Sequence, residues 1–444
     1  MALSGLDIYK LLAKTNCKDC GYSTCLAFAM ALAQKKTSLD KCPHVSKEAS
    51  EALESASQPP IKLVTIGKGD SRLEIGNETV MYRHEQKFYH PAGIGFIIDD
   101  KMNDADIDAR LSKINALAFE RVGLSIKPDA ICIKNSSNNK DQFVKAVAKA
   151  VSGSKLNIVL CAKDAAALDA ALKICSEKRP LVVWDGEGSL DAFVKLAKEN
   201  AVPLAVTCSS PDEIAQAVDT AKKGGVDEIV VNIKEKSIAK RIQLFTYMRR
   251  AALRKNFRPF GYPAMAFTAE GDEAMELCEA VTYVLKYAGL VIVNNIEKEF
   301  VFPLLVARQD IYSDPQKPVQ VEPKIYEIGK VNSNSPVIVT TNFSITYFTV
   351  AGEVEASKVP TYIISCDSEG MSVLTAWAAE KFTAERIIET MKKTGIESIV
   401  GHKKVIIPGY ASVLSGRLQE LSGWSVVVGP REASGLPNFL RNLK

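Results

Sequence analysis

The sequence predicts an α/β protein of three parts: a small cysteine-rich N-terminal module, a central βα barrel and a C-terminal doubly wound domain. Three observations support this prediction. Four cysteines cluster between residues 17 and 42, strand-like and helix-like stretches alternate from Ile61 to about Tyr312, and the alternation restarts after a proline-containing break at 313–335. The 444 residues also exceed one ordinary hydrophobic core and suggest two or three domains.

Composition excludes several classes of protein. Apolar residues make up 47% and charged residues 24%, and the net charge of +4 comes from basic and acidic residues that are mixed along the chain. This balance is typical of a globular protein and gives no basis for nucleic-acid binding. The N-terminus lacks the pattern of a signal peptide, and no apolar run approaches the roughly 20 residues that cross a bilayer. We therefore expect a cytoplasmic protein with no membrane segment.

The first segment, residues 1–58, ends where Pro59 and Pro60 stop any helix. Its cysteines have the spacing C-x2-C-x4-C-x16-C, the last is followed by proline, and a short helix is predicted at Leu26–Gln34. Zinc sites usually place their ligands as two tight pairs, whereas three close thiolates with a distant fourth before proline are typical of ferredoxin-like clusters. The spacing favours an iron–sulfur cluster, with a zinc site and buried thiols as alternatives. The candidate metal ligands are Cys17, Cys20, Cys25 and Cys42.

Six further cysteines are scattered through apolar or helical stretches. In a reducing compartment they are expected to be buried small hydrophobic residues and not disulfides. They are Cys132, Cys161, Cys175, Cys208, Cys278 and Cys366.

The alternating pattern of the second segment, residues 59–312, predicts a TIM barrel. After an expected hairpin of Lys62–Gly67 with Thr79–His84, eight strands are each followed by a helical pattern, a spacing that fits a closed (β/α)8 barrel better than an open sheet. The predicted strands are Gly93–Asp99, Ala130–Lys134, Asn157–Ala162, Leu181–Asp185, Leu204–Ser209, Glu228–Ile233, Ala264–Thr268 and Leu290–Asn294.

Residues 313–330 are predicted to be a linker, and residues 331–444 a small Rossmann-like domain. An antiparallel insertion is expected around Ser344–Glu355. The predicted parallel strands are Val337–Thr340, Tyr362–Cys366, Lys404–Ile407 and Trp424–Val428.

Ligands of open α/β sheets bind beyond the carboxyl ends of the parallel strands. The four loops expected there are rich in small residues, which permit close approach, and in hydroxyls, which can bond the amides of a ligand. Glycines after strands are common in such domains, so composition alone gives this site little support. The candidate cofactor-binding residues are Thr340, Thr341, Thr346, Gly370, Met371, Ser372, Val373, Leu374, Gly409, Tyr410, Ala411, Gly429, Pro430, Arg431, Glu432 and Ala433.

The stretch NCKDCGYSTCLAFAMALAQKKTSLDKCP closely resembles the iron–sulfur motif of the large subunit of corrinoid iron–sulfur proteins of the Wood–Ljungdahl pathway. The likeness extends to PVIVTTNFSITYFTVAGEVEASKVPTY and GWSVVVGPREASG near the C-terminus. It implies a [4Fe–4S] module, a TIM barrel used mainly for assembly, and a Rossmann-like domain that binds cobalamin at the candidate residues.

The resemblance also implies a function. Cob(I)amide would accept a methyl group from methyltetrahydrofolate, held by a separate methyltransferase, and pass it to the nickel-containing cluster of acetyl-CoA synthase. The cluster would reduce cobalt that has oxidised to Co(II), and a smaller barrel subunit would complete a heterodimer. No residue of this chain is assigned as catalytic.

Many cobalamin-dependent methyltransferases bind cobalt through the histidine of a D-x-H-x-x-G motif. The four histidines are His44, His84, His90 and His402, and none lies in such a motif. No protein imidazole is therefore expected on cobalt, which would favour Co(I). Two alternatives are a pterin-dependent methyltransferase acting through its own barrel, with carboxylates such as Asp99 and Asp185, and an electron-transfer protein in which only the cluster acts.

Overall fold

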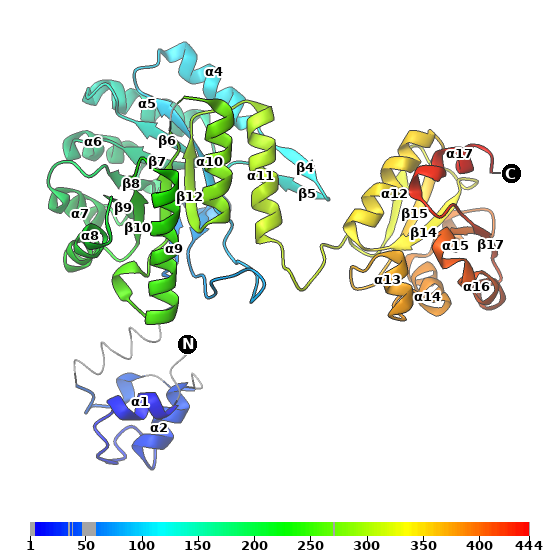
Figure 1. The fold of residues 1–444 in the computed structure, drawn as a ribbon, viewed down its shortest axis with the longest axis horizontal. Coiled ribbons are helices and arrows are strands. Elements are labelled where there is room, and N and C mark those ends of the chain that lie inside the picture. The colour runs from blue at the N-terminus through cyan, green and yellow to red at the C-terminus, as the bar shows by residue number, and fades with distance from the viewer. Residues whose placement is uncertain (1–4, 34–35, 38, 47–58, 270, 444) are drawn as a thin grey trace. The chain divides into compact units, whose positions relative to one another are not determined.

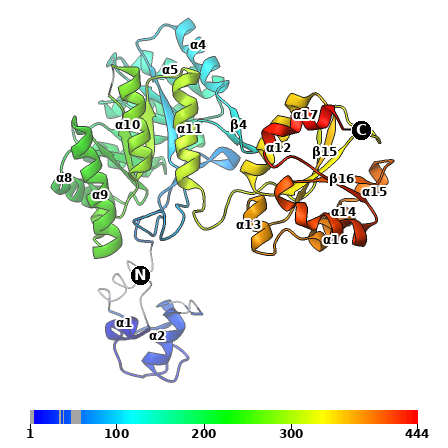
Figure 2. The ribbon, with the colours of Figure 1, turned by 45° about the vertical axis from the view of Figure 1, so that its right-hand side comes forward.

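The computed structural model describes residues 5–33, 36–37, 39–46, 59–269 and 271–443. Among these residues the chain forms two compact units. One runs up to Ala118 and continues over Lys127–Tyr312, whereas the other contains Phe119–Ile126 and the residues from Ser313 onward. Figures 1 and 2 show a small helical module, a barrel, and an open sheet with helices on both faces.

The N-terminal module is built on two short helices. Helix α1 (Gly5–Leu11) packs against α2 (Cys25–Ala33), and the short helix η1 (Leu39–Lys41) follows. Their apolar core contains Ile8, Leu12, Cys25, Phe28 and Ala29. The predicted helix is confirmed as far as Ala33, and its expected last residue, Gln34, lies outside the described residues.

The central part is a closed barrel of eight strands, all paired in parallel. Each predicted strand is confirmed to within two residues at either end, because short β-branched runs bounded by turns are typical of buried parallel strands. The strands are β3 (Gly93–Asp99), β6 (Ala130–Lys134), β7 (Asn157–Cys161), β8 (Leu181–Trp184), β9 (Leu204–Cys208), β10 (Ile229–Ile233), β11 (Ala264–Phe267) and β12 (Ala288–Val293).

A helix follows each barrel strand, as Figure 1 shows for the outer ring. Side chains at the strand-to-helix turns cap several of these helices by accepting a hydrogen bond from a first-turn N–H group, which fixes where the helices begin. The caps are Asn103, Asn139, Asp164, Ser210, Ser237 and Asp272. The helices are α4 (Asp104–Asn115), α5 (Lys140–Gly153), α6 (Ala165–Cys175), α7 (Leu190–Glu199), α8 (Pro211–Lys223), α9 (Ile238–Lys255), α10 (Glu273–Leu285) and α11 (Lys298–Tyr312).

A hairpin packs into the barrel core, but its second strand differs from the prediction. Strand β1 (Val64–Ile66) pairs with β2 (Leu73–Ile75) and not with Thr79–His84. Gly67 and Gly69 adopt positive φ values of 86° and 69°, so the chain reverses earlier than expected. A second hairpin, β4 (Phe119–Arg121) with β5 (Leu124–Ile126), is also absent from the prediction.

The C-terminal part is a five-stranded sheet with the order β13-β15-β14-β16-β17. The four predicted parallel strands are confirmed, and an edge strand, β13, pairs antiparallel with β15. The strands are β13 (Ile325–Ile328), β14 (Val337–Thr341), β15 (Thr361–Cys366), β16 (Lys404–Ile407) and β17 (Ser425–Val428). Strand β13 lies inside the segment 313–330 that the sequence predicts to be a linker.

Helices cover both faces of this sheet. One face packs against α12 (Ser344–Ser357) and α17 (Leu436–Arg441), through side chains such as Val354 and Leu440. The opposite face packs against α13 (Val373–Ala378), α14 (Ala384–Thr394) and α16 (Ser415–Ser422). The predicted Rossmann-like architecture is therefore confirmed.

The prediction of an antiparallel insertion at Ser344–Glu355 is wrong, because helix α12 covers this stretch. Tyr347, Val350 and Val354 recur at helical spacing and pack against the sheet. Burial of this face outweighs the strand preference of its β-branched residues, since such preferences depend on context.

Among the described residues, no helix has both the length and the apolar character that crossing a membrane requires.

Candidate functional site

The N-terminal module carries all four clustered cysteines, and three of them contact its apolar core. Cys25 is buried at the start of α2, Cys20 and Cys42 are partly buried against the same core, and Cys17 is exposed. Four sulfur donors carried by one compact module are a full ligand set for a cubane iron–sulfur cluster. The residues present therefore fit such a group.

Polar contacts hold the loops that carry these cysteines. The backbone N–H of Asn16 donates to Cys25 Sγ (3.3 Å), and the backbone N–H of Cys25 donates to Asn16 Oδ1 (2.8 Å). Asp19 Oδ2 lies 2.8 Å from His44 Nε2, and this hydrogen bond holds the pKa of Asp19 below its usual value. The ligand atoms of Cys17, Asp19 and His44 lie within 4.8 Å of one another.

The other six cysteines are not all buried as expected. Cys132, Cys175, Cys208 and Cys366 are buried, and Cys161 is partly buried. The prediction for Cys278 is wrong because its side chain is exposed on helix α10.

The C-terminal sheet has a topological switch point between β14 and β16. The chain leaves β14 through α12 on one face to reach β15, and leaves β15 through α13 and α14 on the other face to reach β16. Strand β14 pairs with β15 over five residues but with β16 only at Ile338–Ile406. Ligands of open α/β sheets bind beyond such a point.

A cavity of about 230 Å³ lies at this switch point, between the sheet and α12. Its wall combines the ends of β14 and β16, the first turns of α12, and the loops that follow β16 and β17. Most of the lining is aliphatic. The lining residues are Ile338, Val339, Thr340, Ile345, Thr346, Thr349, Val350, Val373, Ile406, Ile407, Pro408, Tyr410, Gly429, Pro430, Arg431, Ala433 and Leu436.

Four buried hydroxyl groups, on β14, on β15 and at the start of α12, lack hydrogen-bond partners among the described residues. The Oγ1 atoms of Thr340 and Thr341 and the Oγ atoms of Ser344 and Ser365 are buried and unpaired. Thr340 lines the cavity, and Ser365 lies opposite it on β15. Leaving a buried hydroxyl without a partner costs about 1–3 kcal/mol, so the Thr340 hydroxyl is suited to a ligand that carries hydrogen-bonding groups.

The structure brings half of the predicted cofactor residues to the cavity. Thr340, Thr346, Val373, Tyr410, Gly429, Pro430, Arg431 and Ala433 line it. The other predicted residues are not among the lining residues: Thr341, Gly370, Met371, Ser372, Leu374, Gly409, Ala411 and Glu432.

Several of these other residues shape the loops around the cavity. A Cβ at Gly409 would lie 2.7 Å from the backbone of the loop after β17, and the Gly409 N–H donates to Pro430 O (3.1 Å). The two loops can therefore touch only because residue 409 is glycine. Glu432 accepts a hydrogen bond from the Tyr410 hydroxyl (2.6 Å), which raises the pKa of Tyr410.

Asn342 anchors the loop after β15, a role that the sequence did not indicate. Its Oδ1 accepts hydrogen bonds from the backbone N–H groups of Ser368 and Gly370 and from the Ser368 hydroxyl, at 2.9–3.0 Å. Gly370 adopts a φ of +72° in this loop. The loop is thus tied to the carboxyl end of β14.

Sequence reasoning also missed most of the aliphatic lining. Ile345 and Val350 come from α12, which was expected to be extended, and Leu436 comes from α17. Helical spacing of the apolar residues in 344–357 was the available signal.

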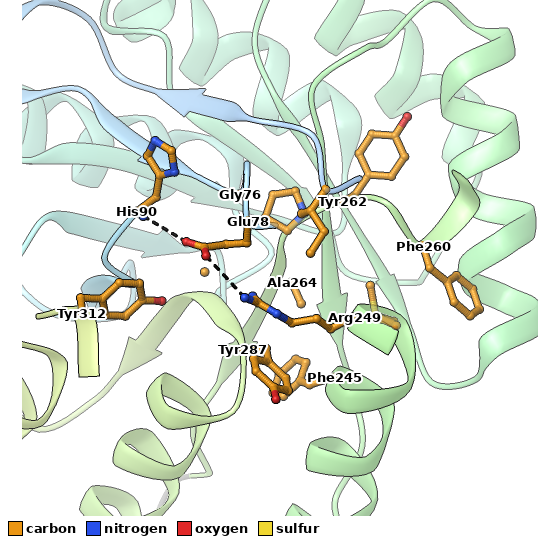
Figure 3. Close-up of a pocket in the computed structure, with 14 residues that line it drawn as sticks. Gly76, Glu78, His90, Phe245, Arg249, Phe260, Tyr262, Ala264, Tyr287 and Tyr312 are labelled. Carbon is orange, nitrogen blue, oxygen red and sulfur yellow. Dashed lines mark hydrogen bonds and ion pairs between the residues drawn. The ribbon is translucent and has the colours of Figure 1, made fainter. Parts of the chain in front are cut away.

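Figure 3 shows a second, smaller cavity of about 30 Å³ at the N-terminal end of the barrel. Glu78 accepts from the backbone N–H of His90 and pairs with Arg249 (3.4 Å), whose guanidinium lies 4.6 Å from the ring centre of Tyr287. A space of this size holds about one water molecule. The cavity is therefore far too small for a corrinoid.

Comparisons with known proteins agree with this architecture. The family model described as CO dehydrogenase/acetyl-CoA synthase delta subunit matches residues 63–440, and an Fe–S cluster family model matches residues 12–44. The chain is 45% identical to the corrinoid/iron-sulfur protein large subunit of Moorella thermoacetica over 99% of both chains. It is 34% identical to the acetyl-CoA decarbonylase/synthase complex subunit gamma of Methanothermobacter thermautotrophicus, over 100% of this chain and 99% of that one. The chain therefore belongs to the family of corrinoid/iron–sulfur protein large subunits and acetyl-CoA decarbonylase/synthase gamma subunits.

Proposed function

We propose that this chain is a methyl carrier that binds a corrinoid at the switch point of its C-terminal sheet. It would receive the methyl group of methyltetrahydrofolate from a separate methyltransferase and deliver it to the nickel–iron–sulfur cluster of acetyl-CoA synthase. The observation that carries the proposal is the cavity between β14, β16 and α12, in a chain that is 45% identical to a protein named for a corrinoid and an iron–sulfur centre.

When bound, a corrinoid supplies a cobalt centre that can accept and release a methyl group. The protein's part is to bind and orient it. The cavity of about 230 Å³ admits one part of so large a ligand, and the rest would lie over the exposed residues at the opening. Ile345 and Tyr410, which line the cavity, are 63% and 40% exposed and offer apolar surface there. The unpaired Thr340 hydroxyl and the loop backbones supply partners for the amides.

We propose that no protein imidazole binds the cobalt. No histidine is found among the described residues that line the cavity. His402, the one histidine of the C-terminal domain, lies 3.0 Å from Ser335 O and accepts from the Lys404 N–H. Absence of a histidine donor favours the lower oxidation state of cobalt, which a methyl carrier needs in order to react.

We propose further that Cys17, Cys20, Cys25 and Cys42 hold one [4Fe–4S] cluster that supports the reduction of Co(II) to Co(I). Residues 1–58 then serve as the cluster module and residues 331–444 as the corrinoid domain. The barrel, residues 59–312, would serve assembly, and the expected partners are a small subunit, the methyltransferase and acetyl-CoA synthase.

Cobalamin binding by the full chain tests the corrinoid site. Thr346→Leu adds bulk to the cavity wall and should weaken binding at least ten-fold, about 1.4 kcal/mol. Glu355→Leu, on an exposed position of the same helix, is the matched control and should bind as the unaltered chain does. The corrin bands of the visible spectrum give the bound fraction. Equal cobalamin affinity of the two variants would place the corrinoid elsewhere in the chain. If the full chain shows cluster absorbance but binds no cobalamin, the methyl-carrier proposal is wrong and the chain is an electron-transfer protein.

Iron and sulfide analysis tests the cluster. Cys20→Ala should lower the content below about four irons per chain, whereas Cys278→Ala removes an exposed thiol outside the module and should leave it unchanged. An unchanged content in Cys20→Ala would remove this thiolate from the ligand set.

A further inference from the structure

Asn16 and Cys25 form a two-way contact inside the N-terminal module. The main chain of Asn16 donates to the sulfur of Cys25 at 3.3 Å, and the side-chain oxygen of Asn16 accepts from the main chain of Cys25 at 2.8 Å. A contact of this kind fixes both the position of the sulfur and the direction from which an N–H group reaches it.

The backbone conformation of Asn16 makes this contact possible. Its φ is +52°, in the left-handed region, where asparagine is tolerated better than most residues other than glycine. Glycine could adopt the same backbone but has no side-chain acceptor. Asparagine therefore combines two properties that the contact requires.

The contact also gives a hydrogen-bond partner to the first N–H group of helix α2. The first N–H groups of a helix have no partner within the helix. Cys25 is the first residue of α2, and its N–H is taken by Asn16, while the N–H of Ala27 is taken by Thr24 Oγ1 at 3.1 Å. Cys25 is 8% exposed, so its sulfur accepts the hydrogen bond of the Asn16 N–H where water screens that bond little.

We propose that Asn16 is a positioning residue for the cluster: its N–H···S hydrogen bond raises the reduction potential, and its side chain holds Cys25 in place. The inference rests on the proposed cluster at the four cysteines. Reduction adds negative charge to a cluster and its sulfurs, and hydrogen bonds to those sulfurs favour the more negative state. Loss of the bond should therefore lower the potential.

Two substitutions separate the backbone from the side chain. Asn16→Gly keeps the left-handed backbone but removes the acceptor, so Cys25 loses its anchor and the N–H···S bond loosens. We expect a more negative midpoint potential and a loss of iron to a chelator that is about five-fold faster, the factor expected for one hydrogen bond. Asn16→Asp restores an acceptor of the same shape and should return the rate of iron loss to near that of the unaltered chain.

The matched control is Lys18→Gly, which relaxes another residue of the same loop with a φ of +69° and leaves the Asn16–Cys25 contact intact. Potentials are measured on the full chain by redox titration followed by electron paramagnetic resonance, and iron loss by absorbance in the presence of a chelator. Full iron content in Asn16→Gly with an unchanged potential and rate would overturn the inference. The same holds if Asn16→Asp loses iron as fast as Asn16→Gly. Absence of iron from the unaltered chain would instead refute the proposed cluster.

Discussion

Replacing Gly409 by alanine tests whether the loops at the carboxyl ends of β16 and β17 must touch. The added Cβ would lie 2.7 Å from three backbone atoms: Arg431 N, Gly429 O and Pro430 C. Ordinary contacts begin near 3.4 Å, so one loop must move by about 0.7 Å. Backbone atoms cannot turn aside as the end of a flexible side chain can.

The cost follows from two effects. Forcing an extra carbon into a packed region costs about 1–3 kcal/mol. The shift also weakens the Gly409 N–H···O=C Pro430 hydrogen bond of 3.1 Å, worth about 1 kcal/mol. Gly409→Ala should therefore lower the free energy needed to open the sheet locally at β16 and β17 by about 2–4 kcal/mol. It should weaken cobalamin binding as well, because Gly429, Pro430 and Arg431 line the cavity.

Hydrogen exchange of the full chain, followed by mass spectrometry on peptides from β16 and β17, measures the change locally. Exchange there should quicken about 30-fold or more. Gly352→Ala is the matched control, because its added Cβ meets no atom within 4 Å in the middle of α12 and should stabilise that helix by about 0.5–1 kcal/mol. Unchanged exchange and unchanged cobalamin affinity in Gly409→Ala would refute the requirement for glycine.

Three further predictions concern the rest of the chain. Arg249→Met leaves a buried carboxylate without its partner and should destabilise the barrel by about 3–5 kcal/mol, measured by thermal unfolding; a loss below about 1 kcal/mol would contradict the pairing. A fragment beginning at Val331 lacks β13 and should unfold about 2–3 kcal/mol more easily in urea than one beginning at Ser313; equal midpoints would show that β13 adds nothing. Burial raises the pKa of Cys175 to about 12, so its thiol stays protonated below that pH. Iodoacetamide at pH 8 should therefore label the exposed Cys278 but not Cys175.

Local periodicity in the sequence predicts most of the secondary structure. The eight barrel strands and the four parallel strands of the last domain lie where the β-branched runs place them, because each run is bounded by turn residues and followed by a helical pattern. The spacing of Cys17, Cys20, Cys25 and Cys42 likewise identifies one ligand set, since thiolates so close in sequence can meet without long-range folding.

Long-range packing decided the features that the sequence did not predict. Residues 344–357 are rich in β-branched side chains and form a helix only because one face is buried against the sheet. Strand β13 exists because β15 offers it an unpaired edge. Neither the buried face nor the open edge can be seen in the local sequence.

The candidate site divides in the same way. The sequence by itself determined that small and hydroxyl residues follow the parallel strands, since strand ends and glycines are local features. Only the tertiary structure decided which of them share a cavity, because that depends on the strand order, on the sparse pairing of β14 with β16, and on the face to which α12 returns. The same holds for the Asn16–Cys25 contact, which requires a left-handed residue and a helix start, nine positions apart, to meet.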